Sequence, residues 1–189
     1  MQAIVARHVL SPALLPGAAG RADGSAPARA AVVARLAWLL EEAGLDAESW
    51  RGGDDGPPVL VVAPARRSRV AVDARPDLGA LGLSALAVGS DDTSPALGVT
   101  ATVAVTLLRM SGWDGPVETV EVAGPADQRD DRSIDDVVSS ALARRSLVLV
   151  ALGSDGAELP AGAPAALAAA HVRVVALADL LGAASTVTP

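Results

Sequence analysis

The segment VLVVA at residues 59–63 decides the fold, because it is apolar at every position and stands between Pro58 and Pro64. A strand with one face in water alternates apolar and polar residues, whereas a strand buried on both faces is apolar throughout. Two further runs that are largely apolar lie at residues 83–88 and 147–152. Strands of this kind are typical of parallel sheets covered by helices. We therefore predict a sheet whose central strands are buried on both faces.

Helical segments lie between these strands. Residues 29–43 carry valines and leucines at helical spacing on one broad face, and Gly44 is placed to end that helix. Ser94 is a suitable N-cap and Pro95 a suitable first residue for a second helix. Residues 133–144 begin with a pattern that resembles a capping box, which predicts a third helix.

The order of the elements predicts the fold class. Further strands are expected at residues 3–10, 69–73, 117–122 and 172–177, and a short helix at 164–170. Strands that alternate with helices indicate a three-layer α/β fold, with a largely parallel or mixed sheet and helices on both faces. We expect one domain over residues 1–182 and a frayed C-terminal tail at 183–189. In such sheets, ligands bind beyond the carboxyl ends of the strands.

The composition excludes several classes of function. The chain has no cysteine, which excludes disulfides and thiolate metal sites, and no lysine, which excludes Schiff-base and Walker-type lysine roles. The formal net charge of −7 argues against binding to nucleic acid or to an anionic membrane. No secretory signal and no long apolar span is evident, so we expect a cytoplasmic protein.

Five residues near predicted strand ends are candidate ligand contacts: His8, Ser11, Arg66, Asp91 and Asp155. Asp91 precedes a predicted helix, where it could hold a divalent cation together with Asp92, position a hydroxyl substrate, or simply cap free backbone N–H groups. Asp155 stands in the turn at residues 153–156, which could simply need its glycines or could present Asp155 as an acidic site residue. No G-x-S-x-G, G-x-G-x-x-G or P-loop motif occurs, so neither a serine hydrolase nor a nucleotide-binding protein is predicted.

Three arginines, Arg66, Arg67 and Arg69, follow the strand at residues 59–63. Guanidinium groups beyond a strand end could clamp a phosphate or a carboxylate. The alternative is a solvated loop whose arginines pair with Asp54, Asp55 or Asp73.

The two histidines are candidates for a metal site. A centre with two histidines and one carboxylate would need His8 and His171 together with an acid such as Asp91 or Asp155. His171, however, is expected at the opposite edge of the sheet from His8. We therefore predict no metal and no other cofactor, with His8 as the one weak candidate ligand.

Three stretches of the chain together carry a resemblance to a known family. They are AIVARHVLSPALLP at residues 3–16, the predicted helix from residue 94 with the turn at 111–117, and VLVALGSDGA at 148–157. They resemble the class III extradiol ring-cleavage dioxygenases, specifically small divergent actinobacterial members. Active members of that family hold ferrous iron with two histidines and a glutamate. Since only His8 stands where a family ligand would, the resemblance implies a scaffold without the iron ligands. A fainter similarity, to small tetrapyrrole chelatases, rests on GSDD at residues 89–92.

These observations predict a binding or accessory protein for an unknown small ligand or protein partner. The alternative is a metal-dependent enzyme, either a degenerate dioxygenase relative or a chelatase-like protein, that uses His8 with nearby carboxylates. A third possibility is an interaction protein that works as a homodimer. The sequence leaves open whether the chain is an enzyme.

Overall fold

The computed structural model describes residues 3–18, 23–45, 58–79, 81–83, 96–123, 132–144, 146–153, 167 and 174–176. The elements within these residues follow one another in this order: β1 (Ile4–Val9), η1 (Pro12–Leu14), α1 (Ala26–Glu42), β2 (Val59–Pro64), β3 (Arg69–Val72), α2 (Val99–Met110), β4 (Val117–Val122), α3 (Arg132–Ala143), β5 (Leu147–Leu152) and β6 (Val174–Ala176).

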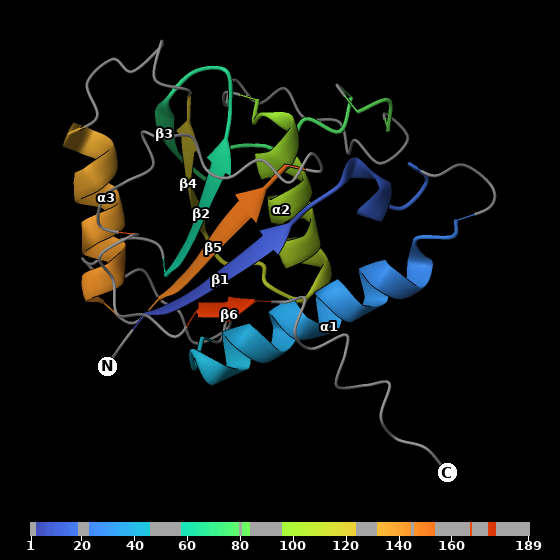
Figure 1. The fold of residues 1–189 in the computed structure, drawn as a ribbon, viewed down its shortest axis with the longest axis horizontal. Helices are drawn as coiled ribbons and strands as arrows, with labels where there is room; N and C mark the ends of the chain where they lie inside the picture. Colours follow the sequence, from blue (N-terminus) through green and yellow to red (C-terminus); the bar gives the residue numbers. More distant parts are fainter. Residues whose placement is uncertain are drawn as a thin grey trace.

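The strands form one mixed sheet in the order β3-β4-β2-β5-β1-β6 (Figure 1). All neighbouring pairs are parallel except β3 with β4, which is antiparallel and lies at the edge. β2 and β5, the two runs that are apolar throughout, occupy the centre. The prediction of a largely parallel or mixed sheet is confirmed.

Helices cover both faces of this sheet, which gives the three predicted layers (Figure 1). Leu147 and Leu149 of β5 belong to the hydrophobic cluster that includes the buried residues of α1 and α2. Val148 and Val150 belong to a second cluster, which includes Ile134 and Val138 of α3. Alternate side chains of β5 therefore pack into two separate hydrophobic cores, as expected for a strand that is covered on both faces.

Helix α2 is the most deeply buried helical segment, with seven of its twelve residues buried. Its C-terminal end is closed by Trp113, which is 2% exposed and donates from Nε1 to the carbonyl of Pro116 at 3.3 Å. Arg109 donates to the carbonyls of Trp113, at 3.1 Å, and of Gly115, at 2.5 Å. A Cβ atom on Gly115 would lie 2.6 Å from the indole, so this turn requires glycine.

The predicted start of α2 is wrong. The sequence predicts that Ser94 caps this helix and that Pro95 is its first residue. In the structure α2 begins at Val99, after the N-cap residue Gly98. Ala96 instead forms a parallel bridge with Arg75, and the N–H of Leu97 donates to the carbonyl of Arg75 at 3.1 Å. The chain is therefore still extended where local rules predict helix.

Several predicted elements fall outside the described residues. These are most of the strand at 83–88, all but Leu167 of the short helix at 164–170, and the tail at 183–189. No helix in the described ranges is long and apolar enough to cross a membrane.

Candidate functional site

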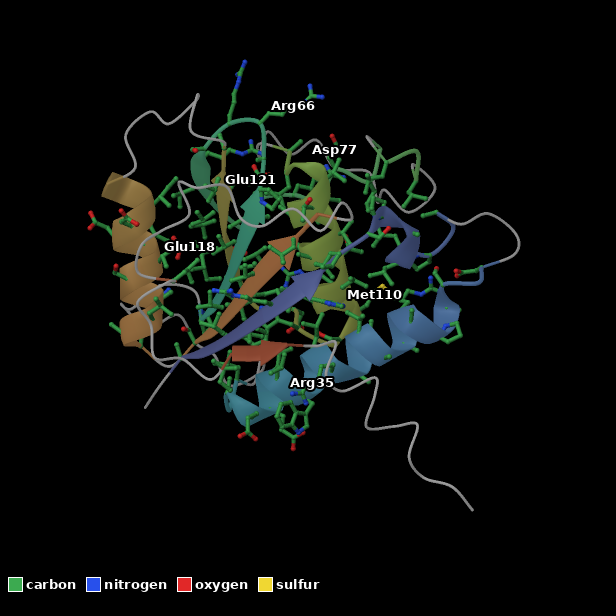
Figure 2. All side chains as sticks on the ribbon, in the orientation of Figure 1. Arg35, Arg66, Asp77, Met110, Glu118 and Glu121 are labelled. Carbon is green, nitrogen blue, oxygen red and sulfur yellow. The ribbon has the colours of Figure 1, made fainter. Side chains whose placement is uncertain are left out.

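A cleft of about 970 Å³ opens at the carboxyl end of β2, beside the first turn of α2. Its lining comes from the β2–β3 turn at residues 64–69, from residues 96–100, and from Asp77 and Glu121. β2 lies between β4 and β5, so the cleft occupies the edge of the sheet at which open α/β folds bind ligands. Figure 2 shows Arg66 at the turn, with Glu121 closer to the sheet and Asp77 near α2.

Glu121 is the buried charge of this cleft, with 1% of its surface exposed. Its Oε1 accepts the N–H of Gly98 at 2.6 Å, and its Oε2 accepts a hydrogen bond from Nε of Arg69. Arg69 also donates to the carbonyl of Ala96. Burying a carboxylate is costly unless charged or dipolar donors replace water, and here both oxygens have one. The carboxylate therefore joins β3, β4 and the start of α2.

Glu121 also serves as the cap of α2. Gly98 is the N-cap residue and has no side chain to satisfy the free N–H groups of the first turn. A carboxylate at this position interacts favourably with the partial positive charge of the helix N-terminus. A Cβ atom on Gly98 would stand 2.6 Å from Oε1 of Glu121, so a larger residue here would displace this carboxylate.

The three arginines of the predicted cluster have different surroundings in the structure. Arg69 is held by Glu121, whereas Arg66 and Arg67 are exposed at the tip of the β2–β3 turn. No acidic side chain within the described ranges pairs with Arg66 or Arg67. Of the three suggested partners, Asp73 lies at the far end of β3, where its Oδ1 accepts the N–H of Val117 at 2.9 Å, and Asp54 and Asp55 lie outside the described residues.

The turn that carries these arginines is anchored to β4. The N–H of Ala65 donates to the carbonyl of Val122 at 2.9 Å, and the Oγ of Ser68 accepts the N–H of Ala123 at 3.0 Å. Both ends of the turn are therefore fixed, and Arg66 and Arg67 project from a backbone of defined position.

His8 and Ser11 lie elsewhere on the sheet and do not line the cleft. His8 is on β1, opposite Ala151 of β5, so β5 separates it from β2. Its Nε2 is buried without a hydrogen-bond partner among the described residues, and burial lowers the pKa of the imidazole from 6.5. Ser11 is the N-cap of η1, and its Oγ accepts the N–H of Ala13 at 3.2 Å.

The other predicted contacts, Asp91 and Asp155, lie outside the described residues, as does His171. Within the ranges that are described, no group of three or more histidine, aspartate or glutamate side chains could hold a metal ion. Of the residues considered for that metal site, His8 is the one that the structure describes.

A second glutamate of β4, Glu118, differs from Glu121. Its carboxylate lies 3.6 Å from Nη2 of Arg144, and its side chain is 13% exposed. Burial raises the pKa of Glu118, while Arg144 opposes that rise.

The sequence prediction missed Glu121, Gly98 and the role of Arg69. A signal was present in the strand at 117–122, because Glu118 and Glu121 must lie on opposite faces of that strand and helices were predicted to cover both faces of the sheet. A carboxylate on the buried face of a strand needs a partner, and this requirement could have singled it out.

Searches against protein-family models, curated proteins and solved structures found no match to this chain. The resemblance to extradiol dioxygenases therefore stays a prediction.

Proposed function

We propose that this protein is a binding or accessory protein that takes a small anionic ligand into the cleft beside α2. In this proposal the chain uses an extradiol-dioxygenase-like scaffold without the iron ligands of that family. The observation that carries the proposal is that Arg66 and Arg67 stand exposed at the cleft with no acidic partner in the described chain. Guanidinium forks bind carboxylates and phosphates by paired hydrogen bonds.

Two further features support binding over acid–base chemistry. The cleft lies at the carboxyl edge of the sheet, and its arginine-bearing turn is anchored to β4. Glu121 is engaged through both of its oxygens, by Gly98 and Arg69, and therefore serves the structure of the cleft.

Calorimetric titration with acetate, hexanoate and inorganic phosphate at low ionic strength tests the proposal. At least one of these anions should bind with 1:1 stoichiometry. The double variant Arg66→Gln/Arg67→Gln should weaken that binding at least tenfold. The control Arg7→Gln changes an exposed arginine of β1 that does not line the cleft, and it should bind as the unaltered protein does. Absence of any anion binding, or equal weakening in the control, would contradict the proposal.

The second candidate is a metal-dependent enzyme, and one observation favours it. His8 has a buried Nε2 without a described partner, and its lowered pKa keeps the imidazole neutral near pH 7, as metal ligation requires. Metal analysis of protein purified without chelators separates the two candidates. A stoichiometric transition metal that is lost in His8→Ala would favour the enzyme.

A further inference from the structure

The cleft has opposite charges at its mouth and at its floor. Arg66 and Arg67 stand exposed at the mouth. At the floor, Glu121 balances Arg69 and also occupies the positive end of α2. The helix terminus, which would otherwise attract an anion, is therefore already neutralised from within.

The walls between mouth and floor are mostly carbon. The apolar part of the lining comes from Pro64 and Ala65 of the β2–β3 turn and from Leu97 and Val99 beside the start of α2, while Asp77 also lines the cleft. Val99 is 47% exposed although it begins α2. An uncharged apolar group laid along these walls would be removed from water without leaving a buried polar group unpaired.

We infer that the ligand is a monocarboxylic acid with an uncharged apolar body. Its carboxylate binds Arg66 and Arg67, and its hydrocarbon body lies along Ala65 and Val99. Glu121 is the specificity-determining residue, because its charge cancels the positive charge of Arg69 and of the α2 N-terminus, which would otherwise draw a small dianion to the floor. This inference rests on the proposed function and deepens it.

Charge and shape both favour this class over inorganic phosphate. A dianion gains most where positive potential is concentrated, but at the floor Glu121 has already cancelled that potential. A planar monocarboxylate fits the guanidinium fork and can stay at the mouth. Each fully buried methylene group raises the affinity about fourfold. Because the cleft is open, it buries these groups only in part. We therefore expect the affinity for hexanoate to exceed that for acetate by at least tenfold.

The first test compares ligands on the unaltered protein at constant ionic strength. Hexanoate should bind at least tenfold more tightly than acetate and than phosphate. Val99→Glu should abolish the advantage of hexanoate over acetate. The control Val72→Glu introduces the same charge at a valine that is 55% exposed on β3 and does not line the cleft, and it should keep that advantage.

The second test asks whether Glu121 excludes dianions. Glu121→Gln keeps an oxygen that can accept the N–H of Gly98 but leaves the charge of Arg69 uncompensated. The variant should bind phosphate at least tenfold more tightly than the unaltered protein. Unchanged phosphate binding in a folded Glu121→Gln variant would overturn the role given to Glu121. If this variant does not fold, the ligand series on the unaltered protein decides the ligand class.

The outcomes separate this inference from the proposed function. If acetate, hexanoate and phosphate bind equally and all depend on Arg66 and Arg67, the anion site stands and the ligand class is wrong. If none of them binds, the proposed function itself fails.

Discussion

Strand β4 carries two glutamates on opposite faces of the sheet, and they show how differently a buried carboxylate can be accommodated. On the α2 face, Glu121 is 1% exposed and accepts hydrogen bonds from Gly98 and Arg69. On the α3 face, Glu118 has one cation, Arg144, at 3.6 Å, and burial raises its pKa. The number and closeness of the donors decide whether a buried carboxylate stabilises the fold or is a cost to it.

The largest expected effect is that of Glu121→Ala. This change leaves Arg69 without its carboxylate and the N–H of Gly98 without its acceptor, so the free energy of unfolding should fall by about 3 kcal/mol. Urea denaturation at pH 7 measures the fall. The matched variant Glu118→Ala should lose less, about 1 kcal/mol, because its ion pair with Arg144 is longer, at 3.6 Å, and burial already disfavours its charged form. Equal losses would remove the distinction between the two glutamates.

The next largest effect concerns Gly98, whose backbone N–H donates to Glu121. Gly98→Ala places a Cβ atom 2.6 Å from Oε1 of Glu121, and the forced shift should cost about 2 kcal/mol of unfolding free energy. Gly24→Ala is the control, because a Cβ atom there meets nothing within 4 Å. Differential scanning calorimetry should show a lower Tm for Gly98→Ala only. An unchanged Tm would mean that Glu121 does not approach this backbone closely.

A smaller effect should appear in the pH dependence of stability. Because burial raises the pKa of Glu118 above 4.5, the folded protein binds more protons than the unfolded chain just above that pH. This group therefore makes the protein less stable as pH rises from 4.5 through the raised pKa, and Glu118→Gln should remove that component. Urea titrations from pH 4 to pH 8 give the difference between the variant and the unaltered protein. A difference that does not vary with pH would contradict the raised pKa.

The smallest effect concerns a buried group without a described partner. Burial lowers the pKa of His8 below 6.5, so the folded protein binds fewer protons than the unfolded chain in the window just below that pH. The contribution of His8 is therefore lost as pH falls from 6.5 through the lowered pKa. His8→Gln should flatten the stability profile in that window, which chemical denaturation at closely spaced pH values would detect. A profile parallel to that of the unaltered protein would show that His8 is not desolvated.

The sheet could be predicted because its decisive information is local. β2 and β5 are buried on both faces, and their sequences are apolar throughout for that reason. Helix α1 is buried on one face, and its apolar residues therefore recur at helical spacing. The start of α2 could not be predicted in this way. Ser94 and Pro95 satisfy the local rules for a helix start, but the actual cap of Gly98 comes from Glu121, 23 residues further on.

The site shows the same division between local and distant information. Arg66 was predicted because a strand end is visible in the sequence, and the structure places it at the cleft. Glu121 was missed because its partner Arg69 is 52 residues away and meets it only after β3 pairs antiparallel with β4. Asp91 and Asp155 lie outside the described residues, so their roles stay predictions.

Helix α2 is held by polar contacts at both of its ends, and this restricts its length. Glu121 holds Gly98 before its first turn, and Arg109 of its last turn holds the carbonyls of Trp113 and Gly115. One inserted residue would turn everything beyond it by about 100° and advance it by about 1.5 Å. Gly98 at Glu121 and Trp113 in the hydrophobic core could not then both keep their places. Natural variants of this chain should therefore carry their insertions and deletions outside residues 98–115.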